Sequence, residues 1–168
     1  FPYTTLFRSA SVTMTICRGE GDGKAASKVL TMAVVSIGII GSILMVLSII
    51  FVKPIATILG ADKEILEPAI GYLKPVTWGV LFYMLCGVLT VLVRSDGNPK
   101  LVMIAGVIGN LINIALDYIF IIPMKMGTFG AGLATAIGFS ISMVILWFHF
   151  ILKKNSVSFI KDFWDKVL

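Results

Sequence analysis

The sequence predicts an all-α polytopic membrane protein with four complete transmembrane helices and the end of an earlier one. Of its 168 residues, 58% are hydrophobic and 14% are charged, and the mean hydropathy is +0.99. A soluble chain has about 45–50% apolar and about 25% charged residues. The apolar residues form long uncharged blocks without the alternation of barrel strands. This composition excludes a soluble enzyme and a disordered chain, and the presence of only two cysteines excludes a disulfide-stabilised scaffold.

The start of the chain divides into two parts. Residues 1–9 lack the basic stretch and following apolar run of a targeting segment, and we expect them to be unstructured or foreign to the protein. Residues 10–17 are mostly apolar and predict the last two turns of an earlier helix. The sequence does not begin with Met, so we expect a piece of a longer chain, in which residues 10–152 form part of one unit.

Two uncharged blocks predict the first and second complete spans, since a helix needs about 20 apolar residues to cross the hydrocarbon core. The first block, residues 29–52, lies between Lys28 and Lys53. The second span covers residues 68–93, because the uncharged block before Arg94 is long enough only if the helix begins several residues earlier.

The third and fourth spans follow after short turns. The third covers residues 99–124, with Asn98 as the predicted N-cap and Pro99 at the first helical position. Between Lys100 and Lys125 it contains one charge, Asp117. The fourth covers residues 128–152 and contains no charged residue.

The distribution of basic residues predicts the orientation of the spans. Ten of the 14 lysines and arginines lie before the first complete span, in the turn 94–100 or after residue 152. Since basic residues concentrate in cytoplasmic loops, these three segments are predicted to be cytoplasmic. Residues 153–168 separate apolar from charged side chains and predict a cytoplasmic amphipathic helix or linker. His149 is expected at the inner interface.

A polar stripe marks the third span. At about 100° per residue, four residues of this span share a sector of roughly 60°: Gly106, Asn110, Asn113 and Asp117. A carboxylate at the centre of a span costs about 2.5–3.5 kcal/mol on insertion scales, so the stripe is expected to face protein or a watery cavity. The amides alone can hold helices together. An ionisable group adds the ability to take up a proton or a cation, which depends on its hydration.

Depth in the membrane relates Asp117 to two residues of other spans. Asp117 lies about 27 Å along a helix that starts at Pro99, at about 1.5 Å per residue, and therefore in the outer half of the membrane. Thr135 in the fourth span and Tyr72 in the second lie at a similar depth. The three side chains are therefore predicted to occupy one layer.

A stripe of small residues in the fourth span predicts close helix packing and no chemistry: Gly130, Ala134, Gly138 and Ser142. The sequence contains no metal-ligand cluster, nucleophile–base pair or nucleotide fingerprint. We therefore expect neither an enzyme nor a bound cofactor.

Several short motifs, in this order and spacing, resemble the multidrug and toxic compound extrusion (MATE) transporters. They are Arg18-Gly19-Glu20-Gly21-Asp22, Leu59-Gly60-Ala61 with Tyr72-Leu73, Arg94 to Lys100, Asn110 to Ile121, Met126-Gly127, and Gly130 to Thr135. The resemblance implies a twelve-helix protein of two six-helix lobes related by a pseudo-twofold axis. The chain would then contain the end of helix two through helix six of the amino-terminal lobe, followed by the start of the interlobe linker.

The same resemblance implies a function and a set of residues. The family exports organic cations and other amphipathic compounds in exchange for H⁺ or Na⁺. Its amino-lobe ion site maps onto Asp117, Asn113, Tyr72 and Thr135, while Asn110 and Gly106 are expected to line the cavity. A further Asp of that site belongs to helix one, which this sequence lacks. The implied partners are the lipid bilayer, small cationic substrates and the remaining helices, in a bacterial-type cytoplasmic membrane and without nucleic acid.

Two alternatives remain at the level of sequence. A related lipid-linked oligosaccharide flippase would have basic residues lining its cavity, and the predicted spans contain only Lys74 and Lys100, each close to an end. A non-transporting membrane scaffold would use the polar stripe only to hold helices together.

Overall fold

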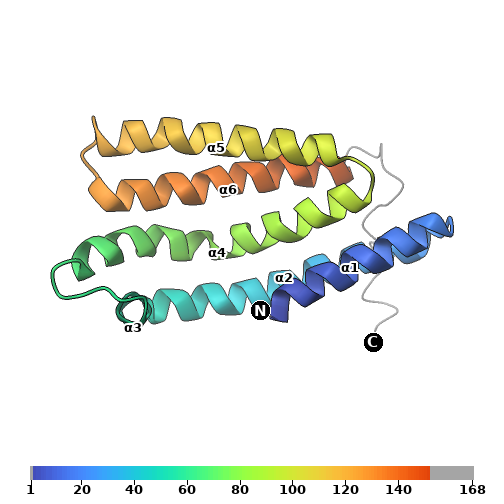
Figure 1. The fold of residues 1–168 in the computed structure, drawn as a ribbon, viewed down its shortest axis with the longest axis horizontal. Helices are drawn as coiled ribbons and strands as arrows, with labels where there is room; N and C mark the ends of the chain where they lie inside the picture. The colour runs from blue at the N-terminus through green and yellow to red at the C-terminus, as the bar shows by residue number, and fades with distance from the viewer. Residues whose placement is uncertain (1, 152–168) are drawn as a thin grey trace.

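A computed structural model describes residues 2–151 of the chain, which form six α-helices (Figure 1). The predicted linker 153–168 lies outside the described residues. The helices are α1 (Pro2–Gly19), α2 (Gly23–Ile50), α3 (Val52–Ile58), α4 (Leu66–Ser95), α5 (Pro99–Ile121) and α6 (Gly127–Ile151). Within residues 2–151, four of these helices are long and apolar enough to cross a membrane: α2, α4, α5 and α6. They confirm the four predicted spans.

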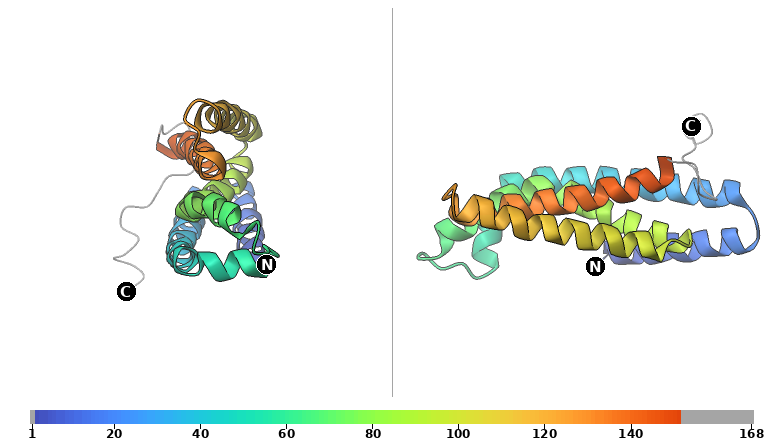
Figure 2. Two further views of the ribbon diagram at one scale, coloured as in Figure 1. Left: turned by 90° about the vertical axis from the view of Figure 1, so that its left-hand side faces the viewer. Right: turned by 90° about the horizontal axis from the view of Figure 1, so that it is seen from above.

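The long helices run lengthwise beside one another as a bundle (Figures 1 and 2). Helix α6 packs most extensively against α4 and α5, while α2 packs against α4 and α1. Helix α4 is therefore central, and α5 lies at one edge. Most side chains of α5 are exposed, as expected for a helix that faces lipid or further helices.

Local chemistry explains where the helices begin and end. The Asp22 carboxylate accepts hydrogen bonds from the backbone N–H groups of Lys24 and Ala25, so α2 begins six residues before the predicted span. Asn98 accepts from the N–H of Leu101 at 3.2 Å, which confirms it as the N-cap of α5. Helix α5 ends at Ile121, three residues early.

The structure differs from the sequence prediction in two segments. Residues 2–9 are helical rather than unstructured, because α1 begins at Pro2 and continues without interruption to Gly19. Its exit turn has Gly21 at a φ of +76°, a conformation that favours glycine. The predicted loop after the first span contains the short helix α3, which ends near Gly60 at a φ of +93°. The break at Phe51 between α2 and α3 lies within the uncharged block 29–52, which gave no signal for it.

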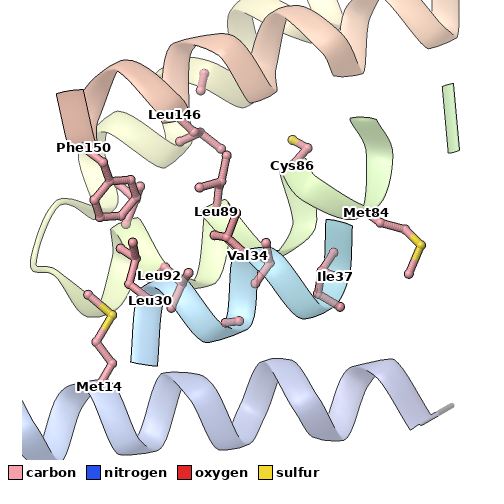
Figure 3. Close-up of a cluster of buried hydrophobic side chains, with 14 of the residues drawn as sticks. Met14, Leu30, Val34, Ile37, Met84, Cys86, Leu89, Leu92, Leu146 and Phe150 are labelled. Carbon is pink, nitrogen blue, oxygen red and sulfur yellow. The ribbon is translucent and has the colours of Figure 1, made fainter. Parts of the chain in front are cut away.

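Apolar packing is concentrated toward the predicted cytoplasmic end of the bundle. The core contains fully buried side chains of α2 and α4, joined by Met14 of α1 and by Leu146 and Phe150 of α6. Figure 3 shows Leu146 and Phe150 pointing from α6 toward Leu89 and Leu92 of α4. Toward the other end, α4 contains Pro75, which has no N–H to donate within the helix, and the helix bends along its length in Figure 1.

Candidate functional site

Two helices that cross closely, α5 and α6, form the frame of the candidate site. A Cβ added at Gly109 would meet the Ser142 hydroxyl and would lie 2.8 Å from the Gly138 carbonyl oxygen. The Ser142 Oγ donates a hydrogen bond to the Ala105 carbonyl oxygen at 3.0 Å. The two backbones approach this closely only because small residues face each other at the crossing.

A polar cavity of about 140 Å³ lies beside this crossing. Its lining combines the small residues with amide and hydroxyl side chains: Gly109, Asn110, Asn113, Thr135, Gly138, Phe139 and Ser142. The Asn113 Nδ2 donates to the Thr135 Oγ1 at 3.5 Å, and that hydroxyl donates to the Ala131 carbonyl oxygen at 3.0 Å. The Thr135 hydroxyl is therefore held by α6 and offers its oxygen toward α5.

Asp117 lies one helical turn beyond Asn113 on α5, next to the cavity but outside its lining. The side chain is half-buried, and its Oδ1 atom is buried without a hydrogen-bond partner among the residues that the structure describes. A buried carboxylate oxygen without a donor is costly. A bound proton or cation, or a donor from outside residues 2–151, would satisfy it.

The other two predicted site residues, Tyr72 and Gly106, are placed differently. The Tyr72 side chain is 39% exposed and does not line the polar cavity, although its backbone carbonyl approaches Gly132 of α6. Gly106 is exposed, and a Cβ built there would meet nothing within 4 Å. The structure thus brings Asn110, Asn113 and Thr135 around one cavity, with Asp117 adjacent, and leaves Tyr72 and Gly106 outside it.

The four predicted packing residues of α6 are all buried: Gly130, Ala134, Gly138 and Ser142. Gly130 and Gly138 face α5, where added Cβ atoms would lie 2.8 Å from Phe120 Cβ and 2.9 Å from the Gly109 carbonyl oxygen. A second close contact, on the α4 side, was not predicted. There a Cβ at Gly79 would lie 2.9 Å from the Ala136 Cβ, and Gly132 meets the turn that contains Pro75.

An apolar pocket of about 170 Å³ adjoins the polar cavity between α4 and α6. It is lined by Val76, Gly79, Val80, Tyr83, Thr135, Ala136 and Phe139. The rings of Tyr83 and Phe139 meet edge to face, with centroids 4.8 Å apart and an interplanar angle of 88°. Thr135 and Phe139 line both spaces.

Tyr83 and Phe139 were not predicted as site residues. The available signal was the spacing of Val76, Val80 and Tyr83 on α4, which places them on one face. That spacing does not reveal which helix faces them.

The fold and the site define a multi-pass membrane protein with a polar cavity between its helices. The family model MatE matches residues 3–119, and the chain belongs to this family, the MATE multidrug efflux transporters. The chain is similar to the multidrug export protein MepA of Staphylococcus haemolyticus (strain JCSC1435), with 34% identity over 121 residues. It is also similar to the probable multidrug resistance protein NorM of Photorhabdus laumondii subsp. laumondii, with 31% identity over 132 residues.

These similarities cover most of this chain but only part of each relative. The alignments include 72% and 76% of this chain, but 27% of MepA and 29% of NorM. Among solved structures, an inward-facing conformation of a multidrug resistance MATE family transporter of the MOP superfamily matches with a TM-score of 0.88 and 23% identity. That match covers 96% of this chain and 37% of the solved chain, and it supports the fold.

Proposed function

We propose that the chain forms part of an antiporter that exports amphipathic organic cations in exchange for H⁺ or Na⁺ by alternating access, and that Asp117 takes up the coupling ion. The observation that carries this proposal is the buried Oδ1 atom of Asp117, which has no donor within residues 2–151. A fixed structural carboxylate is expected to be hydrogen-bonded. A carboxylate that binds and releases an ion has to leave an oxygen available for it.

The neighbouring oxygens suit the same role. Asn113 contributes an amide oxygen one turn from Asp117, and the Thr135 hydroxyl lies within hydrogen-bond distance of the Asn113 amide. Carboxylate, amide and hydroxyl oxygens are the ligands that hard cations prefer, and a carboxylate alone is sufficient for a proton. We infer that Asn113 and Thr135 orient the ion at Asp117. Tyr72 would join them only after a movement of α4.

The apolar pocket supports an amphipathic substrate. Its aliphatic lining and the Tyr83–Phe139 ring pair suit the apolar body of such a compound, and aromatic faces attract organic cations. Because Thr135 and Phe139 line both spaces, substrate in the pocket and an ion at the polar cavity would act on the same stretch of α6. Such shared contacts couple two binding events.

Neither alternative function gains support from the cavities. None of the residues that line the polar cavity or the apolar pocket is basic, whereas a carrier of anionic lipid-linked sugars needs positive charge there. A scaffold in which the stripe only holds helices together does not explain why the buried Oδ1 atom of Asp117 has no hydrogen-bond partner within residues 2–151.

A transport assay with the variant Asp117→Asn tests the proposal. The variant is placed in a full-length transporter that carries residues 1–168, reconstituted in liposomes with an imposed H⁺ or Na⁺ gradient. Uphill export of ethidium is expected to fall to the level of protein-free liposomes, because the isosteric amide does not exchange a proton or neutralise Na⁺. The control is Asp62→Asn, an exposed acid in the α3–α4 loop, which should transport normally. Full uphill export by Asp117→Asn would refute the proposal. The polar stripe of α5 would then be explained by helix packing alone.

A further inference from the structure

A second polar cluster lies at the opposite end of the bundle, where the α4–α5 turn meets the last turn of α6. There the His149 Nε2 and the Asp96 Oδ2 are 2.9 Å apart. The two side chains are only 10% and 2% exposed. His149 lies in the last turn of α6, and its ring is directed into the bundle against Asp96, a contact that was not predicted. His149 is the single histidine of the sequence.

The surroundings of this pair are apolar. Leu92 and Val93 of α4 are fully buried, and Leu146 and Phe150 of α6 are at most 3% exposed (Figure 3). The His149 ring also meets the Phe150 ring edge to face, with centroids 5.0 Å apart. A well-packed apolar pair would stabilise such a position at least as well as a buried ion pair does. Buried polar pairs are retained in some proteins because they specify one geometry.

Each partner belongs to a different part of the lobe. Asp96 is the C-cap residue of α4 and lies in the short turn before α5. A contact at Asp96 therefore constrains the end of α4 and the start of α5. His149 lies two residues before the end of α6. At the same end, the hydroxyl groups of Ser11 in α1 and Ser95 in α4 are 2.8 Å apart. The basic side chains of the turn, Arg94 and Lys100, are exposed.

We propose that Asp96 and His149 form a clasp that makes the ends of α4, α5 and α6 move as one block. With the clasp closed, any relative movement of these helices is restricted to the other half of the bundle, where the polar cavity and Pro75 lie. The clasp does not depend on the role of Asp117, because it is a property of the lobe itself and lies at the opposite end of α5.

Distances between spin labels test the clasp in the 168-residue chain in lipid nanodiscs. Cys17 and Cys86 are replaced by Ser, and nitroxides are attached at Lys100→Cys and Phe148→Cys, two exposed positions beside the clasp. A second label pair, at Glu67→Cys and Thr128→Cys, reports on the far end, where both positions are also exposed. With Asp96 and His149 unchanged, each label pair should give one narrow distance distribution.

Three variants separate a clasp from a general loss of stability. His149→Phe should roughly double the width of the distribution beside the clasp and leave the far end unchanged, because only the local contact is lost. His149→Gln retains a hydrogen-bond donor and should keep the distribution narrow. If His149→Phe fails to fold because the buried Asp96 carboxylate loses its contact with His149, Asp96→Asn with His149→Phe removes that charge and should show the same local broadening.

Two results would overturn the clasp. One is an unchanged width of the distance distribution between the labels at positions 100 and 148, both in His149→Phe and in the double variant Asp96→Asn with His149→Phe. The other is equal broadening at the two ends of the bundle, which would indicate a general loosening rather than a local clasp.

Discussion

Thr135 lines both the polar cavity and the apolar pocket. The hydroxyl donates to the carbonyl of Ala131 and accepts from Asn113, so its oxygen is held in place by its own helix. Asn113 in turn lies one turn from Asp117. An ion at Asp117 therefore has oriented dipoles nearby on α5 and α6, two helices that cross closely.

Thr135→Val removes this hydroxyl and retains the shape of the side chain. In the full-length transporter, the ion concentration needed for half-maximal ethidium export should rise about three- to tenfold, because one hydrogen bond contributes about 1 kcal/mol. The measurement is export rate against H⁺ or Na⁺ concentration. Ser140→Ala is the control, since its hydroxyl donates to the Ala136 carbonyl of the same helix at 2.8 Å. An unchanged ion requirement in Thr135→Val would contradict this role.

At the scale of the helices, the α5–α6 crossing sets the width of the polar cavity. Gly109 and Gly138 bring the backbones together, and the Ser142 hydroxyl bonds the Ala105 carbonyl across the interface. A larger side chain at the crossing has to move one helix as a whole, because a backbone carbonyl lies opposite each glycine.

Gly109→Ala tests the crossing and has a matched control on the same helix. The added methyl group meets Ser142 and the Gly138 carbonyl, so the free energy of unfolding should fall by about 1–3 kcal/mol. At Gly106, a methyl group meets nothing within 4 Å, and Gly106→Ala should be neutral or slightly stabilising. Thermal unfolding in detergent measures both variants. Equal effects of the two substitutions would contradict the close crossing.

The sequence was sufficient for features that depend on one helix at a time. Uncharged length predicted the four spans, Asn98 and Pro99 predicted the start of α5, and the spacing of Gly138 and Ser142 predicted a packing face. Features that depend on how two helices face each other were not predictable. The Tyr83–Phe139 pair, the contact of Gly79 with Ala136 and the Asp96–His149 pair all join residues more than 50 positions apart, and hydrophobic periodicity contains no information about such pairs.

At the scale of the whole molecule, the two ends of the bundle differ in character. The end with the α1–α2 and α4–α5 turns has the large apolar core and the Asp96–His149 pair. The other half has the bend of α4 and the polar cavity. A rigid half and an adaptable half are what a lobe needs if it opens a cavity to one side only.

The basic residues predict which half faces the cytoplasm. Lys100 lies in the first turn of α5 and Lys63 in the α3–α4 loop, and both are exposed. With Cys17 and Cys86 replaced by Ser, Lys100→Cys should react with a membrane-impermeant maleimide only in inside-out vesicles, and Lys63→Cys only in right-side-out vesicles. The reverse pattern would overturn the orientation derived from the positive-inside rule.

Simultaneous measurement of ion and ethidium fluxes shows whether Asp117 couples an ion to export. Liposomes that contain the full-length transporter are loaded with ethidium, and ethidium exit is recorded together with ²²Na⁺ movement and internal pH. The original protein is expected to move one of the two ions in fixed proportion to ethidium. Asp117→Asn should release ethidium only down its own gradient and without movement of the coupling ion. An unchanged ion-to-ethidium ratio in Asp117→Asn would contradict the proposal that Asp117 takes up the coupling ion.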